Sequence, residues 1–174
     1  MGQIGRLIAS GGSLTIPYAE RLIAGVTTEQ FARLARPGGI VMQSNHPAWV
    51  FGHLALYPAK VLERLGRPIG DTQPPPGFDE LFKNGAACQD DPAGTIYPNM
   101  DAVTKFFFSA QRIALSAIEE ADDAKLLGQN PAEGRMRELF PTLGSMLIFY
   151  VDGHAQNHFG QISAWRRAMG LPPA

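Results

Sequence analysis

Tyr150-Val-Asp-Gly-His154-Ala-Gln-Asn-His158-Phe-Gly-Gln161 is the stretch that decides how this chain folds. Its two histidines are four residues apart. On an α-helix this spacing is a rotation of about 400°, so both side chains lie on one face, one above the other. Two imidazoles on successive turns can bind a single metal ion, as the His-x-x-x-His pairs of zinc enzymes do. The spacing therefore predicts a helix that carries two metal ligands.

The hydrophobic pattern around this pair indicates that both histidines face the core. At about 100° per residue, the residues within about 80° of His154 are mostly apolar: Leu143, Leu147, Tyr150, Val151, His158, Gln161, Ile162, Trp165 and Met169. The opposite side is polar: Asp152, Gln156, Ser163, Arg166 and Arg167. A buried imidazole needs a hydrogen bond or a metal at each nitrogen. We interpret the pair as metal ligands, and a pair of hydrogen-bonded core histidines is the alternative.

The other two of the four histidines share one further segment, Asn45-His46-Pro-Ala-Trp49-Val-Phe-Gly-His53-Leu. They are seven residues apart, which is two helical turns or about 10 Å, so His46 and His53 cannot both bind one ion on a straight helix. Ser44 or Asn45 is expected as the N-cap of this helix, and Pro47 suits its first turn. We interpret His46 as a residue of the cap region or of a pocket rim.

Composition narrows the class of protein. The 174 residues are 45% hydrophobic and 18% charged, as expected for one compact domain spanning residues 1–174. A net charge of −1 without a basic run argues against nucleic acid and anionic membrane surfaces as partners, and no apolar run approaches about 18 residues. The single cysteine, Cys88, excludes an internal disulfide and a cysteine-based zinc site, which favours a reduced, cytoplasmic setting. We interpret Cys88 as a plain free thiol, with a nucleophile as the alternative.

The hydrophobic periodicity predicts an all-α fold, because no period-2 strand pattern is present. Long helices are expected over residues 3–25, 47–65, 99–121 and 141–170, and a short helix over 28–35, opened by the capping-box pattern Thr27-x-x-Gln30. The connection between the second and third long helices contains at most one turn, near 79–83. It either covers a pocket or is a solvated crossover. Residues 123–139 are polar, with a turn at 132–139. Four long helices with one long crossover predict a four-helix bundle.

Some apolar side chains lie outside the main stripes of their predicted helices: Phe108, Leu115, Ile118 and Phe159. Exposed apolar residues of this kind often mark contacts between chains. The sequence therefore predicts association, as a homodimer.

These segments resemble the DinB-like family, also called YfiT-like metalloenzymes. The resemblance lies in Trp49-Val-Phe-Gly-His53-Leu, in His154-x-x-x-His158-x-Gly160-Gln161, and in Tyr97-Pro98 and Gly170-Leu-Pro-Pro, and it spans nearly the whole chain in element order. It implies an up-down-down-up four-helix bundle in which His53, His154 and His158 bind one divalent ion, with zinc or nickel expected. Members often have a further histidine just before the last ligand, where this chain has Asn157.

The family includes thiol-dependent S-transferases and an isomerase, so the resemblance implies a metal-dependent transferase acting on a low-molecular-weight thiol and an electrophile, or a hydrolase of a small substrate. Three neutral histidines leave a fourth position open, as in catalytic zinc sites. No glutamate follows the first histidine of the pair, which disfavours a protease of the His-Glu-x-x-His type, and no catalytic base is identified. Gln161 is expected to form hydrogen bonds at the site, and Tyr57 and Tyr150 could supply a hydroxyl. The alternative is a metal-binding or stress-related scaffold protein without turnover.

Overall fold

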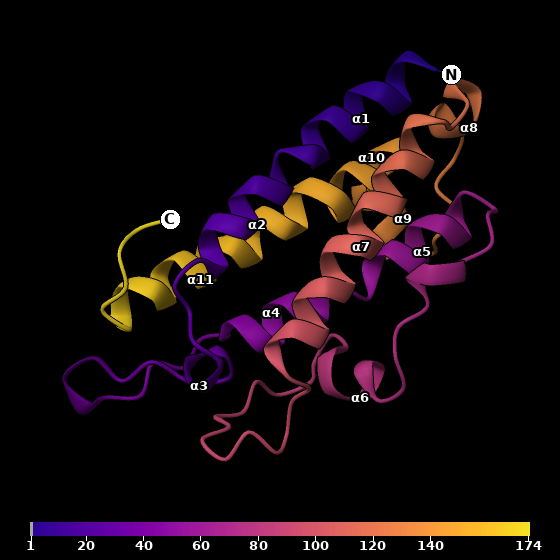
Figure 1. Ribbon diagram of the computed structural model, residues 1–174. Coiled ribbons are helices and arrows are strands. Elements are labelled where there is room, and N and C mark those ends of the chain that lie inside the picture. Colours follow the sequence, from indigo (N-terminus) through magenta and orange to yellow (C-terminus); the bar gives the residue numbers. More distant parts are fainter. Residues whose placement is uncertain (1) are drawn as a thin grey trace.

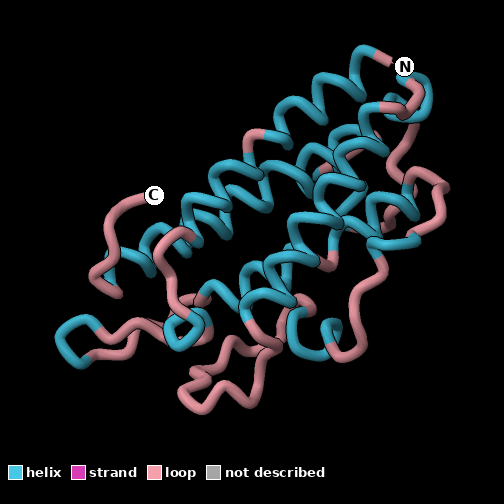
Figure 2. Tube along the Cα trace, in the orientation of Figure 1, coloured by secondary structure: helices cyan, strands magenta, loops and turns pink. Residues whose placement is uncertain are grey.

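The computed structural model describes residues 2–174, and its regular structure is helical, with loops between the helices (Figures 1 and 2). This part of the chain contains no strand, and its one isolated antiparallel bridge joins Gln129 and Thr142. The all-α prediction is confirmed. The longer helices are α1 (Gln3–Ser13), α2 (Thr15–Ile23), α4 (Pro47–Leu54), α5 (Tyr57–Arg64), α7 (Met100–Glu119), α10 (Leu143–Ile148) and α11 (His154–Ala168). The shorter ones are α3 (Thr28–Phe31), α6 (Phe78–Phe82), α8 (Asp123–Leu127) and α9 (Arg135–Leu139).

The longer helices join end to end into helical rods that lie side by side in Figure 1. The pairs α1–α2 and α4–α5 form one rod each, α7 forms a third, and α10 continues through a π-turn into α11. Helix α1 packs on α7 and α10, while α4 and α5 also pack on α7. Helix α11 packs on α2 and α4. The contact between α11 and α4 is what brings the two histidine segments together.

The first rod is interrupted at Leu14, within the predicted helix 3–25. Gly12 allows this rod to approach its neighbours, since a Cβ there would lie 2.6 Å from the Leu115 side chain and 2.8 Å from that of Val151. Pro17 lies in the first turn of α2, where the missing N–H costs nothing.

The second rod is also two helices, where one helix over 47–65 was predicted. Helix α4 ends at Leu54, and α5 begins at Tyr57 with Pro58 in its first turn. Proline removes a backbone donor and crowds the preceding turn, which accounts for the break. His53 therefore lies in the last turn of α4 and not in the middle of a long helix.

Helix α7 matches its prediction closely, with Asn99 as its N-cap. The expectation that four apolar side chains face outward is wrong in most cases: Leu115 is buried, and Ile118 and Phe159 have no exposed surface, while Phe108 is half-buried. The other helices of the same chain cover them. The large exposed apolar side chains are instead Leu7, Leu14, Ile40, Leu127, Leu139 and Ile148.

The predicted helix 141–170 begins two residues late, at Leu143, after a capping box formed by Thr142 and Ser145. Its middle contains a π-helical turn, Phe149–Gly153, directly before His154. An inserted residue in a π-turn rotates everything before it relative to an ideal helix. Arg166, predicted on the polar side, is only 3% exposed because its guanidinium donates hydrogen bonds to the carbonyls of Leu22, Ala24 and Pro172.

The short helices fit the sequence unevenly. The capping box of Thr27 and Gln30 is present at α3, although α3 is shorter than predicted. Helix α9 falls in the predicted turn at 132–139, whereas α8 was not predicted, because Asp122 both follows α7 and caps α8. Among residues 2–174, no helix has the length and apolar character needed to cross a membrane.

Candidate metal centre

Three of the predicted site residues, His53, His154 and His158, come together between α4 and α11. Nε2 of His154 lies 3.2 Å from Nε2 of His53 and 3.0 Å from Nε2 of His158. One nitrogen from each of the three rings lies within 4.8 Å of the other two. The residues are 2%, 9% and 8% exposed in chain order, so the cluster is buried.

His53 is held by a helix that sequence analysis treated as a single turn. Its Nδ1–H donates a 2.6 Å hydrogen bond to the backbone carbonyl of Phe82, at the end of α6. Gly52 makes this contact possible, since a Cβ there would lie 2.5 Å from the Phe82 ring. The glycine of the Trp49–Leu54 motif thus serves close packing of α6 on α4 and not chain flexibility.

His158 is oriented by hydrogen bonds that involve the side chains of Gln161 and Asn45. Its Nδ1–H donates to Oε1 of Gln161 at 3.0 Å, and Nδ2 of Asn45 donates to the same oxygen at 3.0 Å. The predicted hydrogen-bonding role of Gln161 is confirmed. Nδ1 of His154 is buried without a partner, so the expectation that a buried imidazole has a partner at each nitrogen is not met for that ring. Asn157, at the position where family members often have a histidine, is exposed.

These hydrogen bonds fix the protonation of the rings. Since the Phe82 carbonyl and Gln161 Oε1 accept protons, His53 and His158 carry theirs on Nδ1 and direct bare Nε2 lone pairs at the centre of the cluster. Burial lowers the pKa of all three histidines, that of His53 to about 4 and that of His154 to about 3. The rings are therefore neutral near pH 7, as metal binding requires.

The nitrogen spacing fits a single ion. Zinc–nitrogen bonds of about 2.0–2.1 Å in a tetrahedral site place ligand atoms about 3.3 Å apart, close to the two Nε2 separations of 3.2 and 3.0 Å. Without a cation, the bare lone pairs of His53 and His158 both point at a third imidazole that can donate to only one of them. His53, His154 and His158 are therefore suited to bind one divalent ion, with a fourth position left for another ligand.

Aromatic side chains surround the cluster. Trp49 stacks on His53 with ring centroids 4.7 Å apart, and its indole N–H is buried without a partner. The hydroxyl of Tyr57 lies 3.5 Å from Nε2 of His53, and burial raises the pKa of Tyr57 to about 12, so it remains a neutral donor. The Tyr150 ring packs 5.0 Å from that of Tyr57. In residues 2–174, no carboxylate joins the cluster.

His46 has a structural role. Its Nδ1 accepts the backbone N–H of Trp49, so His46 itself is the N-cap of α4, in place of the predicted Ser44 or Asn45. Its Nε2–H donates to the Gln89 carbonyl at 2.8 Å. The ring has no exposed surface and lies outside the histidine cluster. Its assignment to the cap region is confirmed, whereas a position on a pocket rim is not.

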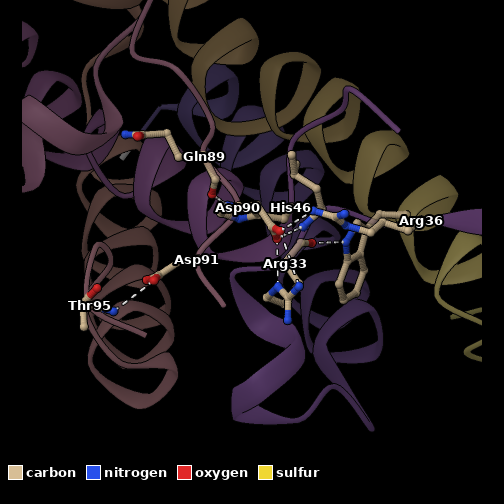
Figure 3. A network of polar contacts seen from close by, with 9 residues as sticks. Arg33, Arg36, His46, Gln89, Asp90, Asp91 and Thr95 are labelled. Atoms are coloured by element: carbon tan, nitrogen blue, oxygen red, sulfur yellow. Dashed lines mark hydrogen bonds and ion pairs between the residues drawn. The ribbon is translucent and has the colours of Figure 1, made fainter. Parts of the chain in front are cut away.

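Two aspartates that the sequence pattern did not identify hold the long connection before α7: Asp90 joins it to the segment after α3, and Asp91 bonds within the connection (Figure 3). The Asp90 carboxylate pairs with Arg33 at 2.8 Å and with Arg36 at 3.0 Å. The Asp91 carboxylate accepts backbone N–H groups of Thr95, Ile96 and Tyr97. The connection is therefore a braced crossover.

Cys88 lies in this connection, where its sulfur accepts the backbone N–H of His46 at 3.5 Å. Burial raises the pKa of its thiol to about 11. Cys88 is therefore a protonated free thiol and a poor nucleophile near neutral pH.

A cavity of about 500 Å³ is remote from this chemistry. It lies between the first rod and α7 and is lined by residues such as Ser10, Ser13 and Arg112, with none of the cluster histidines. The histidine cluster therefore defines the candidate site by its chemistry, without a large preformed pocket.

The structure is therefore that of an all-helical protein in which three histidines form a cluster suited to bind a metal ion. The family model described as DinB superfamily matches residues 14–162, and the chain belongs to this superfamily. The match covers His53, His154 and His158. No curated protein matches the sequence at a significant level.

Proposed function

We propose that this protein is a metal-dependent enzyme that transfers a low-molecular-weight thiol to a small electrophile, with His53, His154 and His158 as the ligands of one zinc or nickel ion. The observation that carries the proposal is the convergence of three neutral imidazole nitrogens, two of them 3.0 and 3.2 Å from the third, with no fourth protein ligand. A divalent ion in this position would act as a Lewis acid that lowers the pKa of a thiol or of water.

The surroundings favour a thiol over water as the nucleophile. Hydrolysis usually needs a protein base to deprotonate water, and no carboxylate joins the cluster. A thiol starts from a pKa of about 8.5, so little further activation is needed. The reaction is R–SH + R′–X → R–S–R′ + HX: the thiol loses its proton, sulfur forms a bond to carbon, and the leaving group departs with a proton.

The chain's own residues would orient the reactants. Tyr57 keeps its proton, because its pKa is raised to about 12, and its hydroxyl lies 3.5 Å from Nε2 of His53. It is placed to donate a hydrogen bond to a leaving group or carbonyl oxygen. Gln161 and the Phe82 carbonyl keep His158 and His53 in their metal-binding tautomers.

A second candidate function is metal binding without turnover, as in a scaffold or stress-related protein. The observation that favours it is the enclosure of the cluster by Trp49, Tyr57 and Phe149 rings, with each histidine at most 9% exposed. In this case the ion stabilises the fold, and no thiol reaches it.

The experiment that separates the candidates uses protein purified without metal-affinity steps. Elemental analysis establishes the ion, and a chlorinated aromatic electrophile is then offered with a panel of small thiols. Thiol conjugation by the metal-loaded protein, absent in His154→Ala, supports the transferase. A stoichiometric ion with conjugation no faster than in His154→Ala for every thiol favours the scaffold.

We further propose that residues 1–174 form one up-down-down-up four-helix bundle that works in the cytoplasm as a homodimer, with a small molecule and neither nucleic acid nor membrane as its partner. The exposed side chains of Leu7, Leu14 and Ile148, 75%, 67% and 48% exposed, provide apolar surface for association. Light scattering at micromolar concentration tests the dimer, and a monomer would contradict it.

A further inference from the structure

Two cations, Lys60 and Arg64, share a face of α5 with Tyr57, the tyrosine that contacts the histidine cluster. Tyr57, Lys60 and Arg64 are separated by three and four residues, so their side chains follow one another along the helix. Lys60 and Arg64 are exposed, and Nζ of Lys60 lies 4.8 Å from the centroid of the Tyr57 ring. The two charges therefore lie at the solvent side of the tyrosine that contacts the cluster.

One aromatic ring separates Lys60 from the metal ligands. The Tyr57 hydroxyl lies 3.5 Å from Nε2 of His53, and its ring centroid lies 4.5 Å from that of His154. The charge of Lys60 acts on both histidines, adding to the effect of burial in lowering their pKa values. The charge of Arg64 acts on Tyr150, the second tyrosine of this wall, where it opposes the rise in pKa caused by burial.

Neither cation forms an ion pair within the described residues, although the exposed Glu63 lies on the same helix. The ion pairs within residues 2–174 involve Arg33, Arg36, Arg67, Lys105 and Arg112 and leave Lys60 and Arg64 without a carboxylate partner. No carboxylate joins the three histidines either. A divalent ion held by three neutral rings would add two further positive charges. A ligand at this site would therefore meet an uncompensated positive potential.

We propose that Lys60 and Arg64 form a subsite for the carboxylate of the thiol substrate, whose sulfur lies at the three-histidine site. This inference rests on the proposed function and adds the substrate class, a small thiol that carries a carboxylate. Arg64 offers a planar pair of donors that matches a carboxylate, and Lys60 adds a mobile point charge. The tyrosine wall of Tyr57 and Tyr150 provides the apolar surface between the two ends of such a molecule.

The test compares two thiols that differ by the charge and one methyl group, 3-mercaptopropionate and its methyl ester. Each is titrated into the full chain loaded with cobalt(II), and the sulfur-to-cobalt absorption band gives its Kd. The measured quantity is the ratio of the ester Kd to the acid Kd. Lys60→Gln and Arg64→Gln should each lower this ratio about two- to fivefold, as expected for an exposed charge pair. The effect should shrink in 0.5 M salt because the charges are screened.

Matched variants distinguish the loss of a cation at the proposed subsite from the loss of a surface cation elsewhere. Arg21→Gln removes the cation that lies 5.5 Å from the Tyr18 ring on α2, and it should leave the ratio unchanged. Lys60→Arg should retain it. Since both cations of the subsite are exposed, Lys60→Gln and Arg64→Gln should bind cobalt and melt like the wild type.

The outcomes that overturn the inference differ from those that overturn the proposed function. Equal loss of acid and ester binding in Lys60→Gln and Arg64→Gln, or no loss of either, refutes the carboxylate subsite and leaves thiol binding intact. Bound cobalt whose spectrum responds to neither thiol refutes the thiol-dependent function, and the subsite with it. Failure to bind cobalt refutes the metal site itself.

Discussion

Replacing His154 by Ala should abolish metal binding. Replacing His46 by Ala should destabilise the protein but leave metal binding unchanged. Nε2 of His154 is the nitrogen nearest to both other ligands, at 3.2 and 3.0 Å, so its loss leaves two imidazoles. His46 lies outside the cluster and caps α4. The two substitutions remove the same side chain from the same fold, and only one removes a ligand.

The magnitudes follow from the contacts. At a free metal concentration of about 1,000 times Kd, binding adds about 4 kcal/mol to stability. In a domain of this size, about 1 kcal/mol shifts Tm by roughly 2–4 °C, so metal should raise the wild-type Tm by about 8–16 °C and that of His154→Ala by almost nothing. His46→Ala loses a helix cap and a ring without exposed surface. This costs about 2–4 kcal/mol, a fall of roughly 5–15 °C with and without metal.

The assay is calorimetry with and without added zinc, alongside elemental analysis, on wild type and four variants: His46→Ala, His53→Ala, His154→Ala and His158→Ala. A stoichiometric ion and a full metal-induced rise in His154→Ala would refute the proposed site. Loss of the ion in His46→Ala but not in His53→Ala would show that the wrong histidine of α4 has been assigned.

Three further predictions test the surroundings of the site. Gly52→Ala should cost about 1–3 kcal/mol in urea unfolding and weaken metal binding, because its Cβ would lie 2.5 Å from the Phe82 ring and displace the carbonyl that holds His53; unchanged stability would contradict this. Cobalt(II) should quench the fluorescence of Trp49, whose ring is 4.7 Å from that of His53; Trp165→Phe should keep the quenching and Trp49→Phe should lose it. Hydrogen bonds and charge from its arginine partners lower the pKa of Asp90 to about 2. Its contribution should therefore be complete above pH 4 and vanish as pH falls toward 2, so Asp90→Asn should cost about 1–2 kcal/mol at pH 7 and progressively less in acid.

The three-histidine cluster was the most predictable part of the molecule. The pair on α11 follows from spacing alone, because an i, i+4 separation fixes two side chains on one helical face whatever surrounds them. His53 required the family resemblance, since nothing in the local pattern specifies which of two histidines on a facing helix points at the pair. The structure separates them by their partners: the His46 ring is occupied by Trp49 N–H and the Gln89 carbonyl, whereas Nε2 of His53 faces the cluster.

The breaks within the rods and the hydrogen bonds around the ligands were less predictable, for a common physical reason. The π-turn before His154 has no local signal, because its cost is offset by packing against other helices. The acceptor for His53 is a backbone carbonyl, that of Phe82, which any sequence would provide. Arg166 is a charged residue, yet it is buried because it donates hydrogen bonds to the carbonyls of Leu22, Ala24 and Pro172. None of these carbonyls can be identified from the local sequence pattern. Each of these features depends on tertiary contacts and not on residue type.

Two buried polar atoms without hydrogen-bond partners lie at the histidine cluster. Among the buried side-chain nitrogen and oxygen atoms of residues 2–174, those without a hydrogen-bond partner are the indole nitrogen of Trp49 and Nδ1 of His154. Each such group costs about 1–3 kcal/mol, and both belong to rings of the same cluster, one a histidine of the cluster and the other stacked on such a histidine. Structural packing alone would favour replacing these rings by apolar side chains, so their concentration at one place is the pattern expected where a binding site is maintained at the expense of stability.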